Sequence, residues 1–344
     1  MKTFQVNGQQ GNSTIYVGEH LSNINTYIPK GVTPVIITDE NIKRLYEDQF
    51  PDGPVITIGT GEANKTLATV EFILRELVRL SCDRSCFILG IGGGIVCDIT
   101  GFAASIYLRG VRFGFVSTTL LSQVDASVGG KNGVNLDAFK NMVGVFNQPE
   151  FVICDVELLK TLPAEEISNG LAEIVKHGLI KDLSMLDFIE ENQEKALALD
   201  RETIFRLVVD SVDIKSRVVQ QDEREAGERR KLNFGHTIGH AIEKLEQKGH
   251  GRAVSMGMVA AARFSREKGY LSTADVDRII NLLQGLNLPV DSSQQADQVI
   301  DAAAMDKKKE GKELFFVFLQ SLGQARVEKI KYDEMNAFVR NEFS

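Results

Sequence analysis

Short apolar runs alternate with amphipathic stretches over the first part of the chain. Five runs rich in β-branched and aromatic residues predict strands, at residues 34–38, 54–58, 86–90, 113–117 and 151–155. Between the second and third runs, apolar residues recur at helical spacing: Leu67, Val70, Ile73, Leu74, Leu77 and Val78. Such a stripe is typical of a helix that packs on a sheet. Strands that alternate with helices predict a mostly parallel, Rossmann-like α/β domain.

After Pro163 the pattern changes to helical periodicity, interrupted by one candidate hairpin at residues 314–319 and 325–330. We therefore expect a boundary between residues 156 and 163. It separates an α/β domain of residues 1–160 from a mainly α-helical domain of residues 161–344. Two-domain enzymes usually bind their ligands in the cleft between the domains, so we expect the active site there.

Composition limits the possible partners. The 344 residues carry 39 Lys and Arg against 47 Asp and Glu, a net charge of −8, which gives no general attraction for nucleic acid or an anionic membrane. The four cysteines form no C-x-x-C pair, and residues 1–10 lack the apolar core of a signal peptide. The longest apolar runs fall far short of the ~20 residues that span a bilayer. We expect a cytoplasmic protein with reduced thiols.

Three of the five histidines lie close together in the chain: His236, His240 and His250. The first two are spaced i, i+4 and project from one helix face, and histidine is the commonest metal ligand. For two histidines alone, a metal site and a hydrogen-bonded structural pair are equally good interpretations, and the third favours the metal. Glu173 and His177 form a second i, i+4 pair. Spacing does not choose among these five candidate ligands.

The predicted strand at residues 86–90 runs into a glycine-rich turn, residues 90–94. A bare backbone at a strand-to-helix turn can approach a diphosphate and point amides at it. The match to G-x-G-x-x-G is incomplete because Ile95 holds the third glycine position, so a tight packing turn is the alternative. Asp39 follows the strand at residues 34–38, where its carboxylate can accept from ribose hydroxyls, cap the next helix, or do both.

Lysines near glycines are candidates for binding an anion. Lys131 follows paired glycines, without the spacing of a phosphate-binding P-loop, and Lys140 and Asn141 precede another glycine. Glu173 and Lys176 are spaced i, i+3 on an apolar helical stretch, where a buried carboxylate and ammonium need partners.

Taken together, these motifs closely resemble the 3-dehydroquinate synthase family of the sugar phosphate cyclase superfamily. The resemblance runs from about residue 35 to the C-terminus, in order and at matching spacing. It rests on GGG at 92–94 with Asp98, YLRG at 107–110, TTLL at 118–121 with Asp125, GGK at 129–131, NG at 169–170 with AE at 172–173 and Lys176, DERE at 222–225, NFGH at 233–236, GH at 239–240, HG at 250–251 and DKK at 306–308.

The resemblance implies a lyase reaction of the shikimate pathway, which leads to the aromatic amino acids. The family converts 3-deoxy-D-arabino-heptulosonate 7-phosphate into 3-dehydroquinate and phosphate. It uses NAD, which is reduced and reoxidised within one turnover, and one divalent metal, zinc first and cobalt as the alternative. The implied steps are oxidation of a hydroxyl, phosphate elimination, reduction, ring opening and intramolecular aldol closure. NAD would bind to residues 1–160, and the metal and substrate to residues 161–344.

Matching positions carry the family's roles onto this chain. Glu173, His236 and His250 would hold the metal, which sets aside His177, and His240 would take part in proton transfer. The implied substrate residues are Arg229 and Lys215 for the carboxylate, Lys176 beside the metal ligands, and Lys131, Asn141, Asn233, Lys307 and Arg109 for the phosphate. Of these, Lys131, Lys176, Lys215, Arg229 and Asn233 would join His240 in the catalytic set.

The resemblance also implies a cofactor site and a dimer. The positions matching the family's NAD site are Asp39, Asn41, Glu62, Lys65, Gly93, Gly94, Ile95, Asp98, Thr118, Thr119, Asp125, Thr161, Leu162, Glu166 and Asn169. Arg109 would reach the substrate of the second subunit in a homodimer.

Three positions depart from the family's pattern. Cys97 stands where glycine is common before Asp98, and His177 is an uncommon occupant that could bind metal adventitiously. Arg252 replaces an acidic residue after His250-Gly251, so a ligand-orienting role of that carboxylate would be lost or pass to another group.

Three rival functions remain at the level of sequence. A related cyclase would act on a sugar phosphate such as sedoheptulose 7-phosphate. The presence of Arg229, Lys215 and Asn233 disfavours it, because these residues favour a substrate that bears a carboxylate. A metal- and NAD-dependent polyol dehydrogenase would release NADH. A noncatalytic sugar-phosphate-binding protein would need neither the ligands nor His240.

Overall fold

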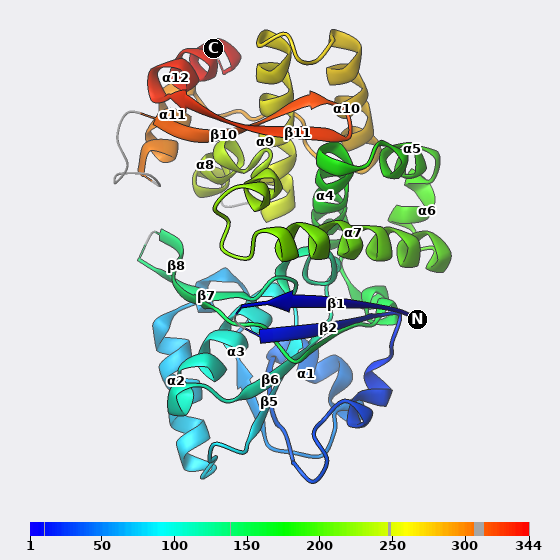
Figure 1. Ribbon diagram of the computed structural model, residues 1–344, viewed down its shortest axis with the longest axis vertical. Coiled ribbons are helices and arrows are strands. Elements are labelled where there is room, and N and C mark those ends of the chain that lie inside the picture. Colours follow the sequence, from blue (N-terminus) through cyan, green and yellow to red (C-terminus); the bar gives the residue numbers. More distant parts are fainter. Residues whose placement is uncertain (10, 138, 247–248, 306–312, 344) are drawn as a thin grey trace. The chain divides into compact units, whose positions relative to one another are not determined.

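The chain folds into two compact units, shown in a computed structural model that describes all residues except 10, 138, 247–248, 306–312 and 344 (Figure 1). The first unit comprises Met1–Leu162 and Lys215–Glu223, and the second comprises Pro163–Ile214 and Arg224–Ser344.

A seven-stranded sheet forms the centre of the first unit, in the order β1-β2-β9-β6-β5-β3-β4 (Figure 1). Neighbouring strands are parallel from β2 to β4 in that order, and β1 pairs antiparallel with β2 at one edge. The strands are β1 Lys2–Gly8, β2 Gly11–Val17, β3 Val35–Asp39, β4 Val55–Ile58, β5 Phe87–Gly92, β6 Arg112–Ser117 and β9 Phe151–Cys154. The five predicted strands and the mostly parallel sheet are confirmed.

Helices cover both faces of this sheet: α1 Glu40–Tyr46, α2 Leu67–Arg79 and α3 Gly94–Ile106. Leu89 and Ile91 of β5 pack in one buried cluster with Ile42 and Tyr46 of α1. The intervening Gly90 faces α3, where an added Cβ would lie 3.0 Å from the Thr100 hydroxyl. The missing side chain therefore lets α3 lie close against β5. Val70, Ile73 and Leu77 of α2 are buried, which confirms for these three residues the predicted apolar face of the helix.

Two hairpins of the first unit were not predicted. One is β1–β2, and the other joins β7 Lys131–Leu136 to β8 Phe139–Phe146. Most residues of β1 and β8 are exposed or half-buried, so neither strand has the continuous apolar run that marked the central strands.

The second unit is mainly helical, as predicted, and carries one hairpin (Figure 1). Its core includes Phe264 of α9, whose ring centroid lies 5.3, 5.1 and 4.3 Å from those of Phe316, Phe318 and Phe338. The predicted hairpin is confirmed as β10 Glu313–Ser321 and β11 Gln324–Lys331. The helices are α4 Ala164–Lys181, α5 Leu183–Glu191, α6 Gln193–Leu197, α8 His236–Glu246, α9 His250–Glu267, α10 Thr273–Gly285, α11 Ala296–Met305 and α12 Tyr332–Glu342, and α7 Arg201–Gln221 runs from this unit into the first.

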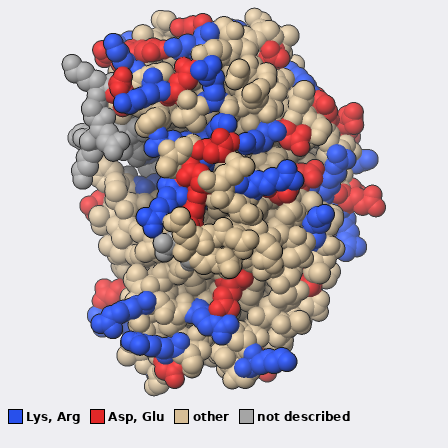
Figure 2. All heavy atoms as spheres, viewed as in Figure 1, with Lys and Arg blue, Asp and Glu red and all other residues tan. Residues whose placement is uncertain are grey.

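The surface shows no single-sign field on the face drawn in Figure 2, where basic and acidic side chains are interspersed. Within the described part of the chain, every helix is too short or too polar to serve as a membrane span.

Candidate functional site

Three side chains that can bind a metal come together in the second unit from three different helices. Glu173 lies in α4, His236 begins α8 and His250 begins α9. The Nε2 atoms of His236 and His250 lie 3.7 Å and 3.6 Å from Glu173 Oε1. One ligand atom from each residue falls within 4.8 Å of the others. A carboxylate and two imidazoles at this spacing are a donor set that suits Zn²⁺ or a similar divalent ion.

Glycines let these three helices approach one another. A Cβ on Gly251 would lie 2.5 Å from the Asn169 Cα, so α9 meets α4 at backbone contact. A Cβ on Gly257 would collide with the Gly235 carbonyl oxygen and lie 2.6 Å from the Gly239 backbone nitrogen, so α9 lies equally close to α8. Because protein interiors are close-packed, side chains at these positions would push the ligand-bearing helices apart.

Charge within the buried group favours the protonation states that bind a metal. Glu173 is fully buried and pairs through Oε2 with the equally buried Lys176. Burial alone would raise the pKa of Glu173, but the Lys176 ammonium and the two histidines hold that pKa well below its usual range. Burial and the same ammonium lower the pKa of His236 well below its ordinary value. A carboxylate and a neutral imidazole are the forms that a divalent cation requires.

His250 has the opposite shift. Burial disfavours its charged form, but the neighbouring carboxylates of Glu173 and Glu243 raise the pKa of His250 to about 9. In the metal-free chain a proton therefore competes with a metal for this imidazole.

The second carboxylate oxygen of Glu173 tests whether this group fits a metal. Lys176 pairs with Oε2, whereas Oε1 is buried and has no hydrogen-bond partner among the described residues. A buried carboxylate oxygen without a partner is costly, and this one is faced by the Nε2 atoms of His236 and His250. A divalent cation would satisfy all three atoms, so the residues fit a metal.

The five candidate ligands do not all belong to this group. The group of Glu173, His236 and His250 contains neither His177 nor His240. The ring centroid of His240 lies 5.1 Å from that of His236 and 5.8 Å from that of His250. His240 is thus a neighbour of the group, where an imidazole can exchange a proton with a bound hydroxyl.

The glycine-rich turn joins β5 to α3 in the first unit. Gly93 is the N-cap of α3 and supplies no side chain to the helix N-terminus. A Cβ on Gly93 would lie 2.9 Å from Thr119 Cγ2, and a Cβ on Gly94 would lie 2.9 Å from Ala126 Cβ. Both glycines therefore pack closely against residues 119–126, as a tight packing turn requires, and the N-terminus of α3 also offers bare backbone amides of the kind that receive a diphosphate.

Other predicted cofactor residues gather at the same edge of the sheet. The carboxyl ends of β3, β5 and β6 meet there because these strands are parallel neighbours. Thr118 donates its backbone N–H to the Gly92 carbonyl oxygen at 3.0 Å. Asp39 accepts from the backbone N–H groups of Asn41 at 2.9 Å and Ile42 at 3.0 Å, so its predicted capping role is confirmed.

Two consecutive family models match the chain. The model described as 3-dehydroquinate synthase N-terminal matches residues 55–169, and the one described as 3-dehydroquinate synthase C-terminal matches residues 170–309. A 3-dehydroquinate synthase from Alkaliphilus metalliredigens is 38% identical over 352 residues, covering 98% of this chain and 98% of its own. The chain belongs to the 3-dehydroquinate synthase family. A second relative of the same description, from Geobacter sp., is 47% identical over 279 residues, 80% of this chain and 77% of its own.

A solved structure supports the same family assignment at the level of fold. It is that of 2-deoxy-scyllo-inosose synthase complexed with carbaglucose-6-phosphate, NAD+ and Co²⁺. It aligns with a TM-score of 0.88 over 99% of this chain and 100% of its own, at 26% identity. Membership of the 3-dehydroquinate synthase family confirms the predicted function at the level of family and the expectation of an enzyme of the lyase class.

Several residues that the 3-dehydroquinate synthase resemblance assigned to NAD or phosphate form one hydrogen-bonded network in the first unit. Lys65 Nζ lies 2.5 Å from both Asp98 Oδ2 and Asn141 Oδ1. Asn135 connects them to Glu62, because its Nδ2 donates to Glu62 Oε1 and its Oδ1 accepts from the Asn141 backbone, both at 2.8 Å. Burial raises the pKa of Asp98, although the Lys65 ammonium opposes that rise. Ligand contacts by these residues stay a prediction.

The predicted carboxylate-binding residues belong to different units. Lys215 lies in the first unit, where its Nζ donates to Asp125 Oδ1 at 2.6 Å. Arg229 lies in the second unit, in the 3-10 helix Glu228–Asn233, and is only 2% exposed. A buried guanidinium and a buried ammonium are uncommon, and their contact with a substrate carboxylate stays a prediction.

Three of the remaining predicted substrate residues, Lys131, Asn233 and Arg109, lie in the described part of the chain. Lys131 begins β7 and is exposed, and Asn233 donates its side-chain amide to Glu225. Arg109 is exposed and has a positive φ of 70°. Lys307 lies outside the described residues.

The last predicted cofactor positions follow β9. Thr161 Oγ1 lies 2.7 Å from the Tyr46 hydroxyl at the end of the first unit, and Leu162 follows it. Glu166 and Asn169 lie in α4 of the second unit.

A residue close to the metal group was absent from the predicted set. Glu243 of α8 is 6% exposed, and its Oε2 lies 3.4 Å from His250 Nδ1. Its signal in the sequence was an acidic residue at i+3 from His240 and i+7 from His236, on the same face of the predicted helix as the two histidines.

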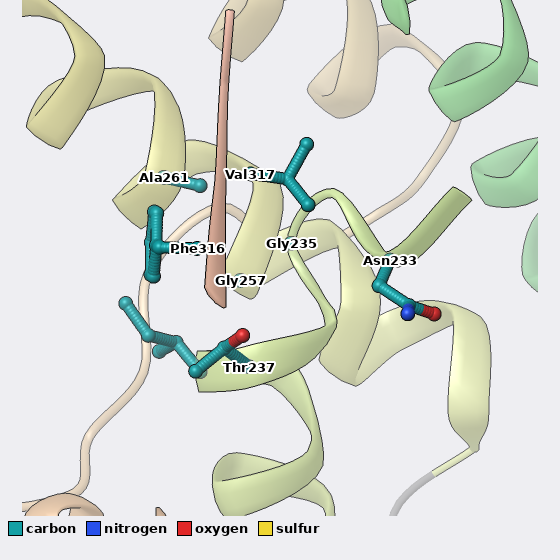
Figure 3. A pocket seen from close by; sticks show the side chains of 8 residues that line it. Asn233, Gly235, Thr237, Gly257, Ala261, Phe316 and Val317 are labelled. Carbon is teal, nitrogen blue, oxygen red and sulfur yellow. The ribbon is translucent and has the colours of Figure 1, made fainter. Parts of the chain in front are cut away.

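The pocket drawn in Figure 3 is separate from the candidate metal site, because none of Glu173, His236 and His250 lines it. It holds about 160 Å³ of empty space, which includes open solvent, and its lining residues are Asn233, Gly235, Thr237, Ile238, Gly257, Ala261, Phe316 and Val317. Asn233 is a predicted site residue, but its amide points away from the Phe316 ring in Figure 3. The small apolar lining is typical of a gap between packed elements.

Proposed function

We propose that this chain converts 3-deoxy-D-arabino-heptulosonate 7-phosphate into 3-dehydroquinate and phosphate, using NAD and one divalent metal. The observation that carries the proposal is the convergence of Glu173, His236 and His250 on one buried carboxylate oxygen. It occurs in a chain that is similar, over 98% of its length, to a 3-dehydroquinate synthase. The related cyclase of the solved complex carries NAD+ and Co²⁺.

Each unit holds one of the two groups in this proposal. Glu173, His236 and His250 would hold the metal, and zinc is the ion that this donor set suits. The turn at Gly93 and Gly94 would bind the diphosphate of NAD through the first backbone amides of α3. When bound, the metal polarises a substrate hydroxyl, and NAD accepts a hydride and later returns it.

His240 takes the proton of the hydroxyl that is oxidised. Its ring lies beside both ligand histidines, and an imidazole can accept and donate a proton near neutral pH. The proton is needed again when the ketone is reduced, so the same group can serve both half-reactions.

Local cations bind the two anionic groups of the substrate. A phosphate and a carboxylate entering a chain of net charge −8 need such cations nearby. We assign the carboxylate to Arg229 and Lys215, and the phosphate to Lys131, Asn141 and Asn233 with Lys307. We assign Lys176 to the residues that contact the substrate, and its ammonium also neutralises the Glu173 carboxylate.

We also propose a cytoplasmic homodimer in which Arg109 reaches the partner's substrate. Free cysteines support the location. Exposed apolar side chains support the dimer, because soluble chains bury such surface when they can. They lie on the end of α3, the adjacent 3-10 turn and the β7–β8 hairpin: Ile106, Leu108, Leu136, Phe139, Met142 and Phe146.

A phosphate-release assay tests the reaction. Purified protein with catalytic NAD and zinc should release phosphate from the heptulosonate phosphate without accumulating NADH. A related cyclase reaction is the second candidate, because the solved neighbour is a cyclase of another substrate. Faster release from sedoheptulose 7-phosphate would favour that candidate, stoichiometric NADH would indicate a dehydrogenase, and no release from the metal-loaded protein would contradict the proposal.

A further inference from the structure

The two ligand histidines have the same neighbour at Nε2 but different hydrogen-bond acceptors at Nδ1. Both Nε2 atoms face Glu173 Oε1, at 3.7 Å from His236 and 3.6 Å from His250. The Nδ1 of His236 lies 3.2 Å from the Phe234 carbonyl oxygen, whereas the Nδ1 of His250 lies 3.4 Å from Glu243 Oε2. A backbone carbonyl therefore orients the first ring, and a carboxylate side chain orients the second.

The acceptor beside Nδ1 decides which ring nitrogen can bind a metal. A neutral imidazole carries one proton, and an acceptor at Nδ1 retains it there, which leaves the Nε2 lone pair free. A carbonyl oxygen and an ionised carboxylate accept but do not donate. Both contacts therefore select the tautomer that presents Nε2 to Glu173, and a carboxylate in addition makes the imidazole a stronger donor to a cation.

The position of Glu243 in α8 makes its contact with His250 a product of the fold. His236, His240 and Glu243 are spaced i, i+4, i+7, which places them along one face of the helix. Glu243 is buried, so its carboxylate is shielded from water and interacts strongly with nearby charge. The same face of α8 thus carries a ligand, its neighbour His240 and the carboxylate that meets the ligand of α9.

The residue that the family's pattern would suggest for this role is directed elsewhere. The resemblance to the 3-dehydroquinate synthase family implied an acidic residue at position 252, where this chain has Arg252. Its backbone N–H donates to Asn169 Oδ1 at 3.2 Å, and its Nε lies 3.7 Å from Glu165 Oε1. The Arg252 side chain therefore pairs with the first turn of α4, and Glu243 supplies the carboxylate at His250.

We propose that Glu243 is a positioning residue, which holds the ring of His250 and fixes its tautomer for metal binding. The inference rests on the proposed function, because it takes His250 as a ligand. The competing arrangement makes Glu243 a ligand itself, since one atom each from His240, Glu243 and His250 also lies within 4.8 Å of the others.

Metal affinity of the purified protein tests the proposal without reference to turnover. Zinc dissociation constants are measured by competition with a chromophoric chelator for the parent, Glu243→Gln and Glu243→Ala. We expect zinc affinity to fall by roughly 10- to 100-fold in Glu243→Ala and by less in Glu243→Gln, whose amide oxygen still accepts a hydrogen bond. Glu246→Gln is the matched control, because Glu246 lies on the same helix and accepts from Ser292 at 2.8 Å. Its affinity should stay within about twofold of the parent.

The visible spectrum of bound Co²⁺ distinguishes positioning from ligation. Glu243→Gln should keep the parent spectrum and a stoichiometry of one metal, because its ligand set is intact. Parental affinity in both Glu243 variants would overturn the positioning role, and so would a changed spectrum in Glu243→Gln, which would make Glu243 a ligand. Glu243→Gln is isosteric, so it keeps the test valid should Glu243→Ala fail to fold.

His250→Ala separates this inference from the proposed function. It should lose stoichiometric metal, whereas His177→Ala should retain it. If His250→Ala binds metal as tightly as the parent, the proposed metal site is wrong. If His250→Ala loses metal and both Glu243 variants bind normally, the metal site stands and only the positioning role fails.

Discussion

At the scale of single residues, the Glu173–Lys176 pair decides the chemistry of the candidate metal site. Both side chains are buried on one helix, and the ammonium neutralises one carboxylate oxygen while the other faces two imidazoles. Burying either charge alone would be costly. Lys176 therefore keeps the carboxylate ionised and available to a cation.

Lys176→Met should destabilise the metal-free protein by up to roughly 3–5 kcal/mol, because it removes the buried ammonium and leaves only the protonated His250 to compensate the Glu173 carboxylate. Added zinc should recover part of that loss, since a cation at Glu173 replaces the missing positive charge. Denaturant unfolding with a chelator and with zinc measures both effects.

Lys181→Met is the control for this change. Lys181 lies on the same helix and pairs with Glu228, but its side chain is 32% exposed. Loss of the Lys181–Glu228 pair should lower the free energy of unfolding by less than about 1 kcal/mol. Equal destabilisation of the two variants would show that burial of the Glu173–Lys176 pair has no special effect.

At the scale of elements, α4, α8 and α9 bring the ligands together because small residues lie where the helices meet. Gly257 of α9 faces the backbone of Gly235 and Gly239, and Gly251 faces Asn169. The geometry of the metal group thus depends on backbone contacts both directly beside the ligands, at Gly235 and Gly251, and farther along the helices, at Gly239 and Gly257.

Gly257→Ala should therefore weaken both the fold and the site. Its Cβ would collide with the Gly235 carbonyl oxygen, and overpacking of this kind costs roughly 1–3 kcal/mol. We expect a lower thermal midpoint and weaker zinc binding. Arg266→Ala, on an exposed position of the same helix, should change stability by no more than about 0.5 kcal/mol. Parental zinc affinity in Gly257→Ala would show that the close contact does not set the site.

At the scale of the whole molecule, the proposed machinery is distributed over two units and two subunits. The glycine turn and Lys215 belong to the first unit, and the metal group and Arg229 belong to the second. The location of the reaction in the cleft between the domains stays a prediction. So does the role of Arg109 in binding the substrate of the partner subunit.

Subunit complementation tests the Arg109 assignment. Arg109→Ala and His250→Ala should each be inactive alone. A hybrid dimer would contain one site with an intact metal group and an Arg109 from its partner, so a refolded equal mixture should recover about a quarter of the parent activity. No recovery, in a mixture that forms hybrids by differential tagging, would place Arg109 in its own subunit's site or outside any site.

The sequence predicted the central strands because buried parallel strands need continuous apolar runs, as at residues 86–90. It did not predict β1 or β8, because strands with exposed faces lack that signal. It also could not show that Lys215–Glu223 clusters with the first unit, because α7 is one uninterrupted helix.

The sequence by itself determined the α/β class, the glycine turn, the family and a set of five candidate ligands. Only the tertiary structure shows that Glu173, His236 and His250 come together, since Glu173 and His250 lie on separate helices and local spacing does not report contact between helices. It likewise placed Glu243 at His250 and turned Arg252 toward Glu165. Periodicity describes one element at a time, whereas a metal site depends on how several elements pack together.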